Sequence, residues 1–113
     1  MRSIQNQIFD SLEIIFIDDC SEDKSITLIE KYKKYDARIS LIKNKKNKGT
    51  LISRNIGALK SRGEFLIFPD CDDTLTQDIL KNCYEICKFY NYDLIRFNMY
   101  SDKYFIFSII NRI

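Results

Sequence analysis

The chain has 113 residues, of which 45% are hydrophobic and 30% charged, and this size and composition are typical of one small, soluble globular domain. Eighteen basic residues against 16 acidic ones leave a net charge of only +2, so there is no electrostatic reason to expect a nucleic-acid partner. The absence of histidine excludes a histidine general base, a Ser-His triad and histidine metal ligands. Any acid–base or metal chemistry must therefore use carboxylates.

The four cysteines, at positions 20, 71, 83 and 87, fit neither a CxxC pair nor a zinc site and are expected to be free thiols. Cys83 and Cys87 share one face of a predicted helix, where free cysteine usually behaves as a small buried hydrophobe. No apolar run reaches the roughly 18 residues that span a bilayer, and no signal-peptide core is present. We therefore expect a cytoplasmic protein, either free or at the cytosolic face of a membrane.

Strand and helix patterns alternate from the start of the chain. The unbroken apolar run from Leu12 to Ile17 predicts a buried strand that ends at Asp18 and Asp19. A capping hydroxyl and acidic residues at 21–23 predict that a helix begins there. The alternating pattern from Arg38 to Lys43 predicts a second strand.

A lysine-rich loop over residues 43–49 and a second helix follow. The helix is expected to begin at Thr50 and to end near Gly63, a natural C-cap. Its inward-facing residues are expected to be Ile52, Ile56 and Leu59. The lysines predict either a solvated loop or a surface that attracts phosphate.

The second half of the chain repeats this alternation. Residues 64–68 predict a third strand, which Pro69 closes just before the acidic cluster Asp70-Cys71-Asp72-Asp73. Residues 74–77 match a capping box for a third helix. The buried stripe of that helix is expected to be Ile79, Cys83, Ile86, Cys87 and Tyr90.

A fourth strand is predicted from Tyr92 to Met99. The last run, from Tyr104 to Ile110, predicts either a fifth strand or an exposed apolar tail. As a strand it could fill or extend the sheet, within this chain or from a second copy. The fold class is therefore α/β, with a mainly parallel sheet built from right-handed crossovers.

The two acidic clusters lie where a binding site is expected. In open α/β sheets, ligands bind outside the carboxyl ends of the strands, so the clusters predict a metal-assisted phosphate or nucleotide site. Structural alternatives are an acidic turn that caps the following helix for Asp70–Asp73, and a plain strand-end turn for Asp18 and Asp19. Arg54 could equally be a solvated arginine on a helix surface.

Three segments, residues 12–23, 48–57 and 63–73, closely resemble the ordered motifs of family 2 glycosyltransferases. Those motifs read EIIxVDDxSxD, GxxxARNxG and GEYIxFLDxDD, and the resemblance covers roughly residues 3 to 100. It implies the GT-A fold, a Rossmann-like three-layer αβα arrangement with a mainly parallel sheet.

The resemblance also implies a donor, a cofactor and a set of site residues. The donor would be a nucleotide-diphosphate sugar, and the acceptor a glycan, a lipid or a protein. Asp70 and Asp72 match the DxD motif that holds a divalent cation, here Mn²⁺ or Mg²⁺. Asp18 or Asp19 would contact the nucleobase, Arg54 and Asp70 would lie at the nucleotide, and Asp73 would support the loop.

Two parts of the family pattern are absent. The initial VSVIIPxYN strand, which is central in the family's sheet, has no counterpart, so we expect an incomplete sheet whose unpaired edges offer a route to a homo-oligomer. The acidic general base of inverting members lies beyond residue 113, so no catalytic residue is assigned. Residues 1–113 are interpreted as a single partial nucleotide-sugar-binding domain, either of an enzyme or of a non-catalytic, degenerate module.

Two rival motifs concern the same carboxylates. Residues 70–74 match the DxDxT motif of haloacid-dehalogenase-like phosphatases, in which Asp70 would be the nucleophile. A receiver-like phospho-acceptor would use Asp18, Asp19 and Asp70. Neither rival accounts for the Ser53–Gly57 segment, which favours the glycosyltransferase resemblance.

Overall fold

A computed structural model of the chain describes residues 2–98 and 106–111. These residues form two compact units: a first unit, Leu12–Arg62, and a second unit, which combines Met1–Ser11 with Gly63–Ile113. The predictions for Met99 and for the start of the last strand, at residues 104 and 105, lie outside the described residues. The two units are described separately below.

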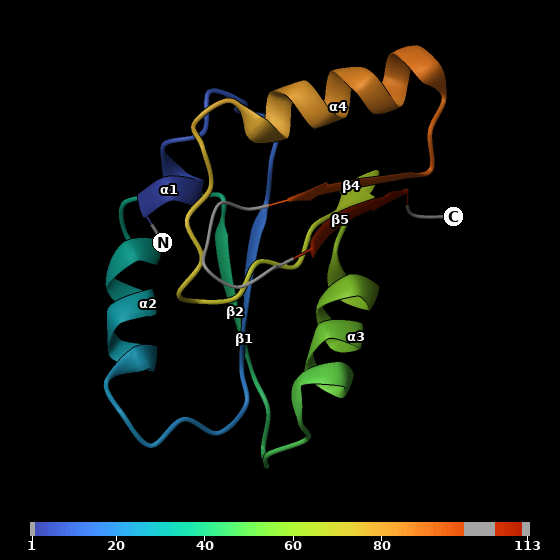
Figure 1. Cartoon of the computed structure of the whole chain (residues 1–113). Helices are drawn as coiled ribbons and strands as arrows, with labels where there is room; N and C mark the ends of the chain where they lie inside the picture. The colour runs from blue at the N-terminus through green and yellow to red at the C-terminus, as the bar shows by residue number, and fades with distance from the viewer. Residues whose placement is uncertain (1, 99–105, 112–113) are drawn as a thin grey trace. The chain divides into compact units, whose positions relative to one another are not determined.

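The first unit follows the order strand, helix, strand, helix. Its elements are β1 (Ile14–Asp18), α2 (Ser25–Lys33), β2 (Ile39–Lys43) and α3 (Thr50–Lys60). β1 and β2 pair in parallel, with Ile14 opposite Ile39 and Asp18 opposite Lys43. Figure 1 shows α2 and α3 on opposite sides of this strand pair. The predicted strand–helix–strand crossover is thus confirmed.

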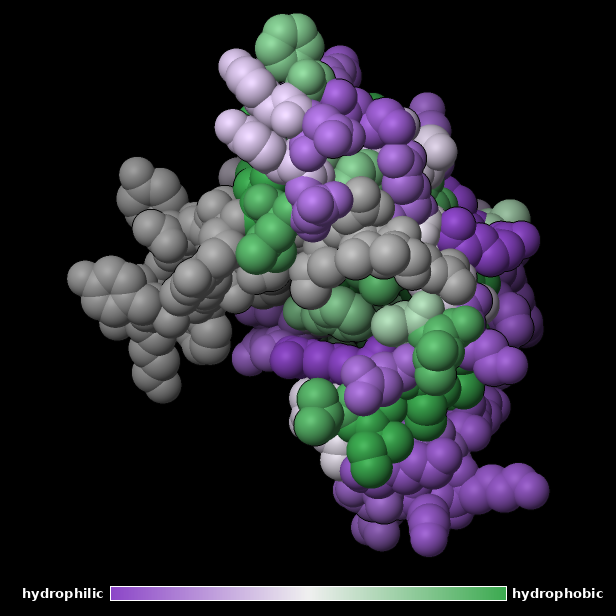
Figure 2. All heavy atoms as spheres, turned by 90° about the vertical axis from the view of Figure 1, so that its right-hand side faces the viewer, coloured by the Kyte–Doolittle hydropathy of each residue, from purple (hydrophilic) through white to green (hydrophobic). Residues whose placement is uncertain are grey.

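The face of α3 that packs on β1 differs from the prediction. Ser53 is buried and Gly57 lies against Ile17, where an added Cβ would be 3.5 Å from the Ile17 Cγ1 atom. Ile52 and Leu59 are instead 50% and 80% exposed, so their predicted inward orientation is wrong. Figure 2 shows apolar side chains gathered over α3 on the face of the molecule that it displays.

Both helices of the first unit have ends that differ from the prediction. α2 begins at Ser25 rather than at residues 21–23, because the Asp23 carboxylate accepts a hydrogen bond from the Ser25 N–H at 2.8 Å. α3 ends at Lys60, and the next residue, Ser61, is extended and donates its hydroxyl to the Ala58 carbonyl at 2.8 Å. Gly63 is therefore not the C-cap.

Among its described residues, the second unit contains three strands and two helices. These are α1 (Arg2–Gln5), β3 (Phe65–Leu66), α4 (Ile79–Tyr90), β4 (Leu94–Asn98) and β5 (Ile106–Asn111). β5 lies between β3 and β4 and is antiparallel to both. The last apolar run is thus a strand of the chain's own sheet, as one of the two alternatives predicted. Figure 1 shows α4 beside the β4 and β5 pair.

The core of the second unit forms on one side of α4. Cys83 and Cys87 are 4% and 1% exposed, and partly buried hydrophobic residues pack against them. Those residues are Phe65, Ile67, Ile79 and Ile95. The prediction of two buried, free cysteines is confirmed. The rest of the predicted stripe is only partly right, since Ile86 and Tyr90 are 42% and 58% exposed.

The start of α4 depends on a distant glutamine rather than on a capping box. α4 begins at Ile79, and Asp78 precedes it without a side-chain capping bond. Buried Gln7 instead accepts a hydrogen bond from the Leu80 N–H at 3.2 Å and donates to the Thr76 carbonyl at 2.7 Å. Because Gln7 is remote in sequence, a local pattern could not reveal this contact.

No helix within residues 2–98 and 106–111 combines the length and apolar character needed to cross a membrane.

Candidate functional site

In the first unit, the predicted site residues lie at the carboxyl end of the parallel strand pair. Asp18 is the last residue of β1, and the loop over residues 43–49 begins at Lys43, the last residue of β2. Because parallel strands end at the same edge, the loop meets Asp18 and Asp19 there. This edge is at the foot of the first unit in Figure 1.

Asp19 is bound to the loop through both of its carboxylate oxygens. Oδ1 accepts hydrogen bonds from the Asn44 side-chain amide at 2.8 Å and from the Lys48 N–H at 2.9 Å. Oδ2 accepts from the Lys48 and Gly49 N–H groups at 3.0 and 2.8 Å. One side chain therefore fixes both ends of the lysine-rich segment.

Asn44 is at the centre of this network, although no motif in the sequence singles it out. Its backbone N–H donates a hydrogen bond to the Asp18 carbonyl at 2.8 Å, and its backbone carbonyl accepts a hydrogen bond from the Cys20 thiol at 3.2 Å. Its side-chain amide bridges Asp19 and buried Ser53, with 3.1 Å to the Ser53 hydroxyl. The only signal in the sequence was an asparagine directly after a strand, at the edge where Asp18 and Asp19 were expected.

Asp18 has a different environment from its neighbour. It is 6% exposed, and its Oδ1 atom accepts one hydrogen bond, from the Ser21 N–H at 3.3 Å. Within the described part of the chain, its second carboxylate oxygen accepts no hydrogen bond. The turn that follows includes Cys20 with a positive φ of 65°, which reverses the chain toward Ser21.

Hydrogen bonding at this edge favours an ionised Asp19 next to a basic loop. The Asn44 hydrogen bond, followed by those from Lys48 and Gly49, lowers the pKa of Asp19 below its ordinary value of 3.8, although desolvation acts in the opposite direction. Lys43 pairs with Glu30 at 3.3 Å. Lys45, Lys46 and Lys48 are exposed and form no ion pair with any residue in 2–98 or 106–111.

Arg54 lies in α3, next to buried Ser53, and is exposed. Ser53 belongs to the Asp19 and Asn44 network, so Arg54 belongs to the helix that this network holds at its first turn. The structure thus brings Asp18, Asp19, the loop and the start of α3 together within one unit.

In the second unit, the acidic cluster forms a closed turn. The Asp73 carboxylate accepts a hydrogen bond from the Asp70 N–H at 2.5 Å, and the Asp73 N–H donates to the Asp70 carbonyl at 3.1 Å. The prediction that Asp73 supports the loop is thus confirmed. α4 begins only at Ile79 and has no side-chain cap, so the alternative that this cluster caps the helix is wrong.

Asp70 and Asp72 are both exposed. Asp72 accepts no hydrogen bond from any residue that the structure describes. Among those residues, no group of three or more His, Cys, Asp or Glu side chains could hold a metal ion alone. Two exposed carboxylates do fit a hard cation whose remaining ligands are phosphate oxygens and water.

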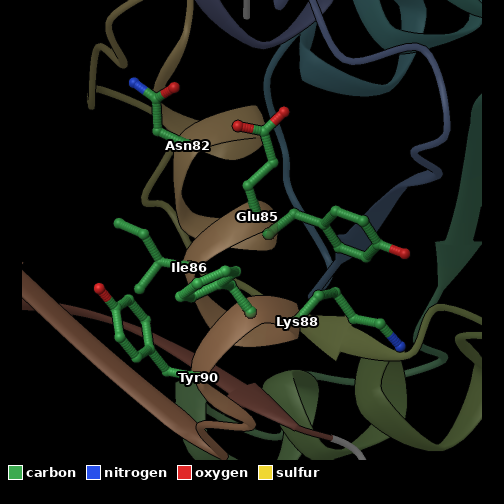
Figure 3. Close-up of a pocket in the computed structure, with 7 residues that line it drawn as sticks. Asn82, Glu85, Ile86, Lys88 and Tyr90 are labelled. Carbon is green, nitrogen blue, oxygen red and sulfur yellow. The ribbon is translucent and has the colours of Figure 1, made fainter.

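A separate hollow of about 810 Å³ lies on the surface of α4 (Figure 3). Its lining consists of Asn82, Tyr84, Glu85, Ile86, Lys88, Phe89 and Tyr90. Figure 3 shows the labelled side chains projecting from successive turns of this one helix. None of the predicted site residues contributes to it.

A match to a protein-family model shows to which family the chain belongs. The model of the family "Glycosyl transferase family 2" matches residues 1–112. The chain belongs to glycosyl transferase family 2. The phosphatase and receiver alternatives predicted other families, and this match supports neither of them.

The chain is also similar to individual proteins that are named as glycosyltransferases. An uncharacterized glycosyltransferase of Haemophilus influenzae is 39% identical over 79 residues, which are 70% of this chain and 32% of that protein. The putative glycosyltransferase EpsH of Bacillus subtilis is 40% identical over 78 residues, which are 69% of this chain and 22% of that protein. The chain thus spans about a third or less of these relatives.

A solved structure shows the same fold. The crystal structure of Staphylococcus aureus TarS residues 1–349, in complex with UDP, superposes with a TM-score of 0.76 and 27% identity. The match covers 82% of this chain and 28% of the TarS chain. The predicted α/β fold of GT-A type is therefore confirmed.

Proposed function

We propose that this chain binds the nucleotide-diphosphate sugar donor of a glycosyltransferase that transfers the sugar to a glycan, lipid or protein acceptor. The observation that carries the proposal is the likeness, over 82% of the chain, to the TarS structure that holds UDP. Support also comes from the acidic residues at the carboxyl end of β1 and in the turn after β3, since each group is a candidate contact for part of such a ligand.

The acidic turn is proposed to hold a divalent cation. Asp70 and Asp72 would be the protein ligands, and their oxygen-only chemistry suits Mn²⁺ or Mg²⁺. When bound, such a cation offsets the charge of the diphosphate and stabilises it as a leaving group. Asp73 supports this role because its hydrogen bond to the Asp70 N–H fixes the turn.

The nucleoside is proposed to lie at the carboxyl end of β1. Asp18 is well placed for a contact with the nucleobase, because one of its carboxylate oxygens accepts no hydrogen bond within the described residues. Asp19 belongs to the same site through the loop, and Arg54 and Asp70 are proposed to contact the nucleotide. No residue of this chain is assigned as the general base.

The experiment is a calorimetric titration of the chain with UDP, GDP and TDP, with and without Mn²⁺. We expect one of the three to bind, and we expect Mn²⁺ to raise its affinity at least tenfold, a gain of about 1.4 kcal/mol. Asp72→Ala should remove the Mn²⁺ effect and leave the metal-free affinity unchanged. Asp10→Ala, which removes an exposed carboxylate elsewhere in the second unit, serves as the matched control.

If no nucleotide binds under any metal condition, the proposal is wrong. An equal Mn²⁺ effect in the wild type and in Asp72→Ala would place the cation elsewhere. Release of UDP from a UDP-sugar, measured in the same samples, distinguishes an enzyme from a non-catalytic binding module. Binding with turnover identifies an enzyme, whereas binding without turnover identifies a non-catalytic module.

A further inference from the structure

The loop between β2 and α3 carries an excess of positive charge that the described structure does not neutralise. Four of the seven residues from Lys43, the last residue of β2, to Gly49 are lysines, and none is acidic. Of these four lysines, only Lys43 forms an ion pair with another residue in 2–98 or 106–111. Lys45, Lys46 and Lys48 therefore present three unpaired charges, close in sequence, beside the carboxyl end of β1. A polyanion is the ligand that complements such a surface.

Mutual repulsion would spread such a loop unless another group held it in place. Asp19 supplies that group, because it bonds the Lys48 and Gly49 N–H groups at one end of the loop and Asn44 at the other. Bonds from backbone N–H groups to an ionised carboxylate are among the stronger ones in proteins. Asn44 extends the same connection to Ser53 in α3.

The two neighbouring aspartates thus differ in their capacity for a ligand. Three donor groups from the loop occupy both oxygens of Asp19, and an ionised carboxylate has about four acceptor positions in all. Asp18 has one oxygen with no hydrogen bond in the described structure. A ligand that took hydrogen bonds from Asp19 would have to displace the loop.

We propose that Asp19 is a positioning residue, which holds the Lys43–Gly49 loop so that Lys45, Lys46 and Lys48 attract the diphosphate of the nucleotide. This inference rests on the proposed function and assigns different roles in that site to Asp18 and Asp19. Asp18 is left for the nucleoside, and Asp19 acts on the phosphates only through the loop. The effect of Asp19 on binding should therefore require both the phosphates and the lysines.

The test compares UDP with uridine, which lacks the phosphates, by titration of the 113-residue chain at two salt concentrations. Loss of a charged acceptor of several hydrogen bonds in Asp19→Asn should weaken UDP binding about tenfold and change uridine binding less than about twofold. In a Lys45→Ala/Lys46→Ala/Lys48→Ala background, Asp19→Asn should have almost no further effect on UDP. The triple variant should also flatten the salt dependence of UDP binding.

A matched triple variant, Lys31→Ala/Lys33→Ala/Lys34→Ala, removes the same charge at the other end of the β-strands, in and just after α2. It should preserve both the UDP affinity and its salt dependence. Equal weakening of UDP and uridine by Asp19→Asn would overturn the proposal, because it would show that Asp19 contacts the nucleoside. The proposal would also be overturned if Asp19→Asn weakened UDP binding about tenfold in the Lys45→Ala/Lys46→Ala/Lys48→Ala background.

Amide hydrogen exchange separates failure of this inference from failure of the proposed function. In Asp19→Asn, exchange at the Lys48 and Gly49 amides should be about tenfold faster, because both donors lose a charged acceptor. Asp18→Asn should leave these two amides unchanged. If the wild type binds no nucleotide but this exchange pattern holds, the proposed function fails while the loop is still held by Asp19. Unchanged exchange in Asp19→Asn contradicts the positioning role whatever the ligand.

Discussion

At the scale of single residues, the environment of a side chain separates groups that the sequence presents as equivalent. Asp18 and Asp19 are adjacent carboxylates. Within the described structure, the Asp18 side chain accepts one hydrogen bond, whereas the Asp19 side chain accepts hydrogen bonds from three donor groups. The sequence predicted that one of them would face a nucleotide. It could not predict which one, because the partners of Asp19 lie 25 to 30 residues further along the chain.

The four cysteines provide a direct test at this scale. Cys20 and Cys71 are exposed, whereas Cys83 and Cys87 are buried, and burial raises the pKa of both buried thiols. Since the thiolate is the reactive form, Cys20 and Cys71 should be alkylated in the folded protein at pH 8 and the other pair only after unfolding. Mass spectrometry of iodoacetamide-treated protein measures this. Modification of all four at one rate would contradict the described core.

The pH dependence of the loop is a second prediction for single residues. The pKa of Asp19 is lowered in the folded state, chiefly by the Asn44 hydrogen bond. Its contribution to stability is therefore fully present above the ordinary value of 3.8 and is lost as the pH falls through the lower folded value. The Gly49 amide resonance should shift only below about pH 4. A shift centred above pH 5, or the same shift in Asp19→Asn, would contradict this assignment.

At the scale of helices and strands, the sequence predicted the order of the elements but not all of their faces. α3 was expected to bury its large apolar residues, yet Leu59 is 80% exposed and the helix approaches β1 through Ser53 and Gly57. These two residues are four apart and so share a face. A hydrophobic pattern gives weight to large apolar side chains, and it therefore could not identify a contact face made of small ones.

Helix ends were predicted less well, because capping signals compete with distant partners. The capping-box pattern at 74–77 does not begin α4, since Gln7 binds the Leu80 N–H and the Thr76 carbonyl. The position of β5 between β3 and β4 likewise depends on pairing between distant segments. The sequence predicted that this segment is a strand, but not which strands lie on either side of it.

Two glycines of the first unit should respond to alanine in opposite ways. Gly57 is helical, and an added Cβ would make ordinary contact with Ile17 at 3.5 Å, so Gly57→Ala should raise the free energy of unfolding by about 0.5–1 kcal/mol. Gly49 has φ 82° and ψ 162°, a conformation that alanine adopts at a cost of about 1–3 kcal/mol. Gly49→Ala should therefore be destabilising. Urea unfolding measures both variants, and destabilisation by Gly57→Ala would contradict the packing of α3 on β1.

At the scale of the whole molecule, the ordered set of three motifs identified the family correctly. The family match over residues 1–112 and the TM-score of 0.76 to TarS establish the relationship and the fold. Two of the three motifs combine an apolar strand, β1 or β3, with the acidic residues that follow it, and the third covers the first turns of α3. The chain spans 22–32% of the two relatives described above, so the activity of the whole protein is a proposal.

We propose above that the Asp70–Asp73 turn holds the cation that accompanies a nucleotide. The most direct test of this proposal is paramagnetic broadening of amide resonances by substoichiometric Mn²⁺, measured with and without UDP. We expect the amides of residues 70–73 to broaden first, and more strongly when UDP is present, and we expect Asp72→Ala to abolish this effect. Broadening centred on other carboxylates, or unchanged by UDP, would contradict it.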